Sequence, residues 1–246
     1  MATLSGKAAL ITGGGRGIGA AIARRLSAEG ADVAITYAGS KARAEALAAE
    51  IAATGRQALA LRADNRDAEA LEAAVAQAAA AFGRIDILVN NAGVYEAAPI
   101  QDLSLQAFDD TFAINVRAVF LATRAALAHM PDGGRVICIG SNLAERAPFG
   151  GQTAYSASKA AVVAFTQALA RDVGARGITA NVVNPGSTDT EMNPADGAHA
   201  ESQRSLMAIP RYGTPEDVAG LVAWLAGPEA GSVTGAAFRI DGGTNA

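Results

Sequence analysis

Short apolar segments alternate with longer segments of helical periodicity along the whole chain of 246 residues. The predicted strands are Lys7–Thr12, Asp32–Thr36, Gln57–Leu61, Asp86–Asn90, Arg135–Gly140, Thr179–Asn184 and Ala236–Ile240. The predicted helices are Gly17–Glu29, Lys41–Thr54, Asp67–Phe82, Leu105–His129, Thr153–Val173 and Pro215–Leu225. Strands that alternate with helices of this length indicate βαβ units, in which helices cover both faces of a parallel sheet. The sequence therefore predicts one α/β domain over residues 1–246, with a doubly wound, seven-stranded parallel sheet.

One long segment, between the sixth predicted strand and the last predicted helix, lacks a long periodic helix. It runs from Thr188 to Pro210 and is interrupted by Pro194 and Gly197. A loop of this length inside a compact domain is usually functional or mobile. We therefore expect residues 188–210 to form a lid over a substrate.

Charge and cysteine content argue against several classes of function. The formal net charge is -4 without a block of like charges, whereas nucleic-acid binding usually shows as a basic patch. Cys138 is the only cysteine, and His129 and His199 lack ligand spacing, so we expect neither a disulfide within the chain nor a metal site. No apolar run approaches the roughly 18 residues of a membrane span, and the first one breaks at Gly13. We expect a cytoplasmic protein without nucleic-acid or membrane partners.

Glycines cluster directly after the first predicted strand, where the chain reads Thr-Gly-Gly-Gly-Arg-Gly-Ile-Gly from Thr12 to Gly19. Glycine permits a positive φ and lets the backbone approach a ligand closely. The helix that follows presents free N–H groups and its positive dipole end to a pyrophosphate. The sequence therefore predicts a dinucleotide-binding loop. Its contact residues are Gly13, Gly15, Arg16, Gly17, Ile18 and Gly19.

The end of the second predicted strand bears on which dinucleotide is bound. A carboxylate there would hold the adenosine 2′-hydroxyl of NAD, but the chain continues from Thr36 to Lys41 without an acid. Arg16 and Lys41 bring positive charge and Ser40 a hydroxyl group, a combination that suits a 2′-phosphate. We predict NADP(H) as the cofactor in preference to NAD(H), with Tyr37, Ser40 and Lys41 beside the adenosine phosphate.

A tyrosine and a lysine lie four residues apart near the start of the fifth predicted helix. Tyr155 and Lys159 therefore project from one face of that helix. A nearby ammonium stabilises phenolate, so we expect a lowered Tyr155 pKa and a usable acid or base. Ser141 follows the fifth predicted strand, at the sheet edge where open α/β folds bind ligands. Ser156 and Ser158 flank the tyrosine but are expected to point away from Lys159, and we leave them out of the predicted site.

A series of motifs in this order and spacing resembles the short-chain dehydrogenase/reductase family over essentially the whole chain. The matching motifs are Thr12–Gly19, Asn90-Asn91-Ala92-Gly93, Asn115, Ser141, Tyr155-Ser156-Ala157-Ser158-Lys159 and Pro185-Gly186. The resemblance implies a Rossmann fold and hydride transfer between nicotinamide and a carbonyl/alcohol pair. It also implies assembly as a homotetramer or homodimer, through the long central helices, the last helix and the final strand.

The resemblance further implies individual roles. Tyr155 is the acid/base, Lys159 holds the nicotinamide ribose and lowers the tyrosine pKa, and Ser141 orients the carbonyl. Asn115 anchors a water in a proton relay. The remaining implied cofactor contacts are Asp64 and Asn65 at the adenine, Asn91, Ala92 and Gly93 on the adenine-ribose side, Pro185 and Gly186, and Thr188 and Thr190 near the carboxamide.

The sequence is compatible with three hypotheses about what the protein acts on or binds. Gly151-Gln152 and Arg176–Thr179 resemble the 3-oxoacyl-carrier-protein reductase branch. An acidic carrier protein requires a basic landing patch, and His129–Gly134 does not supply one, so we expect a free small ketone, aldehyde or secondary alcohol. The segment Thr36–Lys41 and the run from Ser205 through Ala230 also resemble a cyclic-di-GMP-binding, short-chain-like mediator of biofilm dispersal, which makes a regulatory nucleotide binder the alternative from another class.

Overall fold

Seven parallel strands form one sheet in the computed structural model, which describes residues 3–246. They are β1 Ala8–Ile11, β2 Asp32–Tyr37, β3 Ala58–Arg62, β4 Ile87–Asn90, β5 Arg135–Ile139, β6 Thr179–Pro185 and β7 Ala237–Ile240. Their spatial order is β3-β2-β1-β4-β5-β6-β7, and every pairing is parallel. All seven predicted strands are confirmed, and their ends differ from the prediction by no more than one residue.

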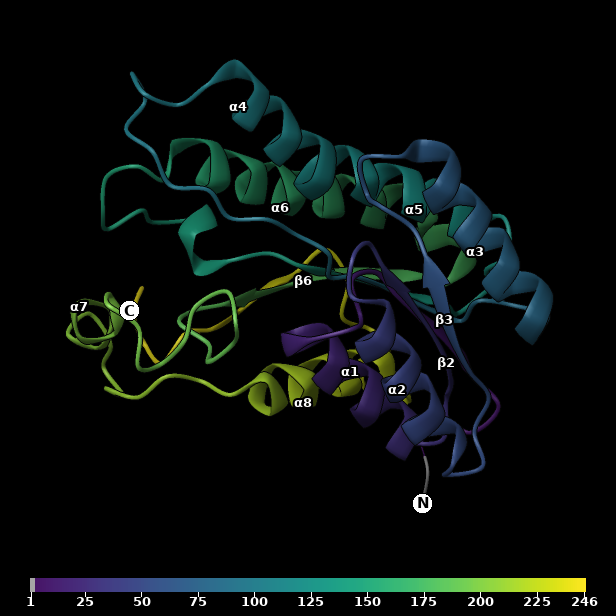
Figure 1. The fold of residues 1–246 in the computed structure, drawn as a ribbon. Coiled ribbons are helices and arrows are strands. Elements are labelled where there is room, and N and C mark those ends of the chain that lie inside the picture. Colours follow the sequence, from purple (N-terminus) through teal and green to yellow (C-terminus); the bar gives the residue numbers. More distant parts are fainter. Residues whose placement is uncertain (1–2) are drawn as a thin grey trace.

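Helices cover both faces of this sheet (Figure 1). One face carries α1 Gly17–Ala28, α2 Lys41–Ala52 and α8 Pro215–Ala226, whose apolar residues share a core with those of β1 and β2. The other face carries α3 Ala68–Phe82, α5 Ala118–Leu127 and α6 Thr153–Val173, which form a second core with β4, β5 and β6. Strands buried from both sides are nearly continuous in apolar residues, as the short runs in the sequence predicted.

The predicted single helix Leu105–His129 is wrong. The structure has α4 Leu105–Phe112, then a π-helical turn at Ala113–Arg117, then α5, which ends at Leu127. A π-helical turn inserts one residue into the hydrogen-bond ladder and re-aims the side chains around it. Here it lies at Asn115, whose side chain is only 1% exposed. Hydrophobic periodicity did not reveal this local change.

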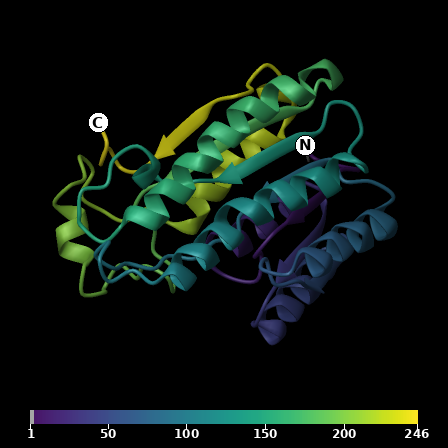
Figure 2. The ribbon, with the colours of Figure 1, turned by 90° about the horizontal axis from the view of Figure 1, so that it is seen from above.

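Because the strands are parallel, the carboxyl ends of all seven lie at one edge of the sheet. Figure 2 shows the arrowheads pointing toward the side where α7 Ala200–Arg204 and the C-terminus lie. The chain passes outward from β1 to β3 and then returns to β4 on the other side of β1. Ligands of open α/β sheets bind at such a reversal of strand order.

The predicted lid segment begins at this edge of the sheet, and the residues that follow it return to lie beside its first residues. Thr188 and Gly213 form an isolated parallel bridge, and the Asp189 N–H donates to the Gly213 carbonyl at 2.9 Å. The segment contains the short helix α7, which the sequence did not predict. After it, Thr214 caps α8, because its hydroxyl accepts from the Asp217 N–H at 3.1 Å. Among residues 3–246, no helix is long and apolar enough to span a membrane.

Candidate active site

The glycine-rich loop lies where β1 and β4 end side by side. Gly13 has φ +64°, and a Cβ on it would lie 2.9 Å from the Ala92 Cα. A Cβ on Gly19 would lie 2.5 Å from the Asn91 Nδ2, so α1 reaches this close only with glycine there. The Asn91 Nδ2 also donates to the carbonyls of Thr12 and Gly13, both at 3.0 Å. The Asn91 amide therefore connects the ends of β1 and β4.

The N-terminus of α1 is suited to hold the phosphates of a dinucleotide. The first turn contains no acidic residue, and Arg16 at the N-cap forms no side-chain capping bond. A hollow of about 570 Å³ adjoins this point and includes Gly15, Gly17 and Thr190 in its wall. Free N–H groups, a positive dipole end and an uncommitted guanidinium together match a pyrophosphate and a further phosphate group.

The residues predicted beside the adenosine phosphate lie at the end of β2 and the start of α2. Tyr37 is buried, and Ser40 is the N-cap of α2 with no side-chain capping bond. Lys41 is exposed, and its ammonium lies 3.7 Å from the Glu45 carboxylate. Because that pair is exposed and widely spaced, its attraction is weak and Lys41 is free to turn toward a phosphate.

The two residues predicted at the adenine differ in how tightly they are engaged. Asp64 accepts from Arg66, with Nη2 to Oδ2 at 2.7 Å. Hydrogen bonds from the Arg66 side chain and backbone hold the Asp64 pKa below its usual value. Asn65 is 8% exposed beside it. Asp64 therefore presents an ionised carboxylate that Arg66 already neutralises.

The structure brings Ser141, Tyr155 and Lys159 together, as predicted. Ser141 is buried just beyond β5, and its hydroxyl is hydrogen-bonded to the Tyr155 side chain. Lys159, one turn along α6, is 5% exposed, and its Nζ lies 5.6 Å from the centre of the Tyr155 ring. The edge of a second ring, that of Tyr95, lies against Tyr155 with 4.9 Å between ring centroids.

The expectation that Lys159 lowers the Tyr155 pKa is wrong for this arrangement. Burial raises the Tyr155 pKa to about 12, the hydrogen bond from Ser141 opposes the rise, and Tyr95 adds to it. The ammonium of Lys159 instead donates to the Ile139 carbonyl at 2.9 Å. Burial also lowers the pKa of Lys159 to about 8. Desolvation is the largest cause of both shifts, and it favours the neutral form of each group.

Ser158, which the sequence prediction left out, belongs to the scaffold of the site. It is fully buried, its Oγ accepts from the Asn115 Nδ2 at 3.1 Å, and the same hydroxyl donates to the Tyr155 carbonyl at 2.7 Å. The Asn115 Oδ1 also accepts from the Val94 N–H at 2.9 Å, and its Nδ2 donates to the Val94 carbonyl at 3.0 Å. The prediction considered only the helix face that carries Tyr155 and Lys159, whereas Ser158 contacts Asn115 of the neighbouring π-helical turn.

Asn184 is a second residue that sequence reasoning missed. Its Oδ1 accepts from the Ser141 N–H at 3.1 Å, and the side chain is fully buried at the end of β6. A Cβ on Gly140 would lie 2.0 Å from that oxygen, so glycine is required there. The only available signal was a polar residue at the end of an apolar strand.

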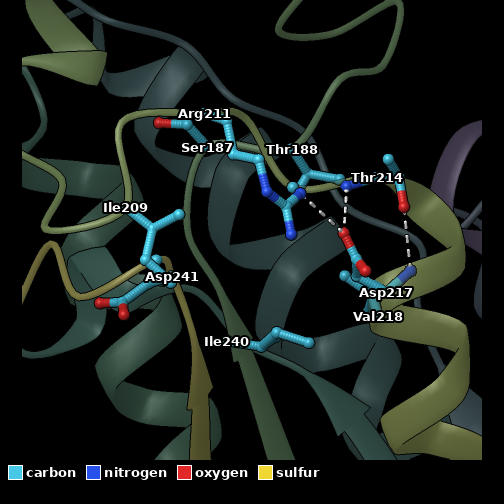
Figure 3. A pocket seen from close by; sticks show the side chains of 11 residues that line it. Ser187, Thr188, Ile209, Arg211, Thr214, Asp217, Val218, Ile240 and Asp241 are labelled. Atoms are coloured by element: carbon cyan, nitrogen blue, oxygen red, sulfur yellow. Dashed lines mark hydrogen bonds and ion pairs between the residues drawn. The ribbon is translucent and has the colours of Figure 1, made fainter.

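The residues predicted near the carboxamide come from the end of β6 and the base of the lid segment. A Cβ on Gly186 would lie 2.6 Å from the Asp241 Cβ, which explains that glycine. Pro185 lies in β6 beside Ile240 of β7. Thr188 lines a pocket of about 190 Å³ between the lid segment, β7 and α8 (Figure 3). Thr190 lies apart from this pocket, 3.4 Å from where a Cβ on Gly17 would be.

Comparison with known proteins identifies this arrangement. A family model described as Enoyl-(Acyl carrier protein) reductase matches residues 13–245. A solved short chain dehydrogenase from Burkholderia cenocepacia J2315, in complex with NADP, is 57% identical, with a TM-score of 0.98 over 99% of this chain and 100% of that one. The chain belongs to the short-chain dehydrogenase/reductase family.

Two further comparisons bear on function. The cyclic-di-GMP-binding biofilm dispersal mediator protein of Escherichia coli (strain K12) is 48% identical over 242 residues, which are 98% of each chain. A solved structure of BdcA in complex with NADPH is 48% identical, with a TM-score of 0.91 over 98% of this chain and 95% of that one. This chain is an oxidoreductase of the same family, and the predicted cofactor, NADP(H), is the one these solved relatives hold.

The lowered pKa of Lys159 predicts how stability depends on pH. Between about pH 8 and pH 10.5, Lys159 is still protonated in the unfolded chain but has released its proton in the folded chain. Stability therefore rises with pH in this window. From about pH 7.5 to about pH 9.5, we expect the free energy of unfolding to rise by about 2 kcal/mol more in the natural protein than in Lys159→Met.

Urea unfolding of both proteins at the two pH values measures this difference. Titrating groups that do not interact with Lys159 are common to both proteins and cancel in the comparison, whereas the pKa of Cys138, which burial raises, depends in part on Lys159. The raised Tyr155 pKa acts only above pH 10, outside the window, because its usual value is 10.0. Equal pH dependence in the two proteins would show that Lys159 keeps its ordinary pKa in the fold.

Proposed function

We propose that this protein is an NADP(H)-dependent carbonyl reductase or alcohol dehydrogenase that acts on a small ketone, aldehyde or secondary alcohol. The main support is the cluster of Ser141, Tyr155 and Lys159 at the same sheet edge as the glycine-rich loop. The hydroxyl groups of Ser141 and Tyr155 are hydrogen-bonded to each other, and we propose that both bind one carbonyl oxygen of the substrate. Bound NADPH would supply the hydride; the chain supplies the proton and fixes the oxygen.

The protein's own groups act on the oxygen of the substrate. Tyr155, with a pKa of about 12, is protonated at neutral pH and therefore serves as the acid in reduction. Ser141 donates a second hydrogen bond to the same oxygen and stabilises its developing negative charge. Lys159 retains N–H groups beyond the one engaged by Ile139, and these suit the hydroxyls of a ribose.

Asn115 and Ser158 help to hold Tyr155 in position. The amide of Asn115 is fully engaged by Val94 and Ser158, and Ser158 in turn donates to the Tyr155 carbonyl. In this arrangement the Asn115 amide fixes the position of α6 relative to the loop after β4. We therefore assign Asn115 a positioning role, while the water relay implied by the family resemblance stays a prediction.

Removing the phenol tests the mechanism. In Tyr155→Phe, we expect NADPH oxidation with a panel of ketones to fall at least about 100-fold, because general acid catalysis supplies this much or more. Loss of NADPH absorbance measures turnover, and calorimetry with NADPH verifies that the variant still binds cofactor. Turnover retained in Tyr155→Phe would refute the assigned role.

Arg16 is proposed to hold the 2′-phosphate. In Arg16→Ala, we expect about tenfold weaker NADPH binding and little change for NADH, since a charged hydrogen bond contributes roughly 1.5–3 kcal/mol. Arg24→Ala is the matched control, because Arg24 lines the same hollow but pairs with Glu50 at 2.8 Å. Equal losses for NADPH and NADH in Arg16→Ala would place the arginine elsewhere on the cofactor.

A free substrate is favoured over a carrier-bound one. The stretch between α5 and β5 contributes Asp132, which pairs with Arg176 at 3.0 Å. That arginine is consequently neutralised where a basic landing patch for an acidic carrier protein would lie. The matching family model nevertheless bears a carrier-protein name, so 3-oxoacyl-carrier-protein reductase remains an alternative.

Cyclic-di-GMP binding is the alternative from another class. It is supported by the 48% identity to a relative named for that ligand. The presence of Ser141, Tyr155 and Lys159 in one cluster favours an enzyme, since a pure binder has no chemical need for them. Calorimetry separates the two: micromolar binding of cyclic-di-GMP with no binding of NADPH would replace the proposed function.

Assembly as a homotetramer or homodimer is also proposed. Large apolar side chains are exposed on the helices expected to pair: Phe108 on α4, Phe120 on α5 and Trp224 on α8. Light scattering at working concentration should give a tetramer or dimer, and a monomer would contradict the proposal. The cytoplasmic location remains a prediction.

A further inference from the structure

An aromatic surface is left open beside the reacting group. Tyr95, in the segment between β4 and α4, contacts Tyr155 edge to face, with ring planes at 81°. The Tyr95 side chain is nevertheless 41% exposed. The Tyr95 ring thus packs against Tyr155, the proposed acid, and remains partly exposed beside it.

The segment that carries Tyr95 is held by a hydrogen bond to the residues just before α6. The Ala98 N–H, three residues further along, donates to the Gly151 carbonyl at 3.0 Å. Gly151 has φ +81° and lies four residues before Tyr155, directly ahead of α6. A Cβ on Gly151 would lie 3.4 Å from the Ala98 N, so the two segments are in close contact. The segment before α6 also carries Phe149, which is 42% exposed.

Two charged residues of the segment between β5 and α6 are engaged elsewhere, whereas Glu96, next to Tyr95 in the sequence, is exposed and carries a negative charge. Arg146 donates to the Thr244 carbonyl at 3.1 Å, and Glu145 lies 3.7 Å from Arg239. Lys159 is buried and bonded to Ile139. The surface beside Tyr155 therefore offers an exposed aromatic ring and a neighbouring carboxylate, and Lys159 is buried; this combination favours an uncharged aromatic substituent over a carboxylate or phosphate.

We propose that Tyr95 makes the enzyme selective for aryl ketones and the corresponding benzylic alcohols. The substrate ring packs against Tyr95 while its oxygen lies between Ser141 and Tyr155. This inference rests on the proposed function and names its substrate class. Aromatic pairs gain about two- to tenfold beyond what burial alone contributes, so a saturated ring of the same size would bury similar area without that gain.

The test compares acetophenone with cyclohexyl methyl ketone, which has the same skeleton but a saturated ring. The readout is the ratio of their kcat/KM values with NADPH, which isolates the aromatic contribution to transition-state binding. In Tyr95→Leu, we expect this ratio to fall about fivefold. In Tyr95→Phe, which keeps the ring and loses only the hydroxyl, we expect it to stay as in the natural protein.

The outcomes separate this inference from the proposed function. If the natural protein reduces ketones but Tyr95→Leu leaves the ratio unchanged, or lowers both kcat/KM values equally, the selectivity inference is overturned and the reductase stands. If Tyr95→Phe lowers the ratio as far as Tyr95→Leu, the hydroxyl and not the ring is responsible, which also overturns it. If neither ketone is reduced, the selectivity inference is overturned, and the reductase stands as long as another carbonyl compound of the panel is turned over with NADPH.

Discussion

The hydrogen bonds that join the ends of β1 and β4 are the constraint on which the site depends. The Asn91 amide donates to the carbonyls of Thr12 and Gly13, while the Thr12 hydroxyl accepts from the N–H groups of Asn91 and Ala92 at 3.0 and 3.1 Å. Strand order reverses at this point, so no helix covers the two strand ends. These bonds hold the glycine-rich loop to the end of β4, while the N–H groups of Gly13 and Gly14 donate to Thr36 and hold it to β2.

Burial of polar groups is the second organising feature, and it is concentrated on the catalytic face. Lys159, Ser158, Asn115 and Asn184 are all buried, and each has a hydrogen-bond partner in the backbone or in a neighbouring side chain. Buried polar groups are costly unless they are satisfied, and a fully satisfied network holds a single geometry. The network thereby orients Tyr155 and Ser141, while the same burial shifts the pKa values of Tyr155 and Lys159 toward their neutral forms.

Much of this site followed from residue order alone. The glycine run after a strand, the serine after the fifth strand and the tyrosine–lysine pair on a helix placed the phosphate loop and the reacting groups at one edge of a parallel sheet. The reason is local: a parallel βαβ repeat puts every strand's carboxyl end on the same side. The prediction therefore needed only the order of elements and not their detailed packing.

The parts that the sequence did not disclose all depend on contacts between distant segments. The π-helical turn at Ala113–Arg117, the bond from Asn115 to Ser158 and the bond from Ser141 to Asn184 join residues up to 43 positions apart. The pKa of Tyr155 was misjudged for the same reason, since desolvation depends on everything that packs around a group and not on its neighbour one helical turn away. The sequence by itself determined the order of strands and helices and the position of the glycine-rich loop, because periodicity and glycine positions are local properties, and its motifs supplied the candidates for the reacting groups. Tertiary structure alone decided which polar side chains hold Tyr155 and Ser141, in which direction the pKa values shift and which aromatic ring packs beside Tyr155, because burial is a property of the assembled fold.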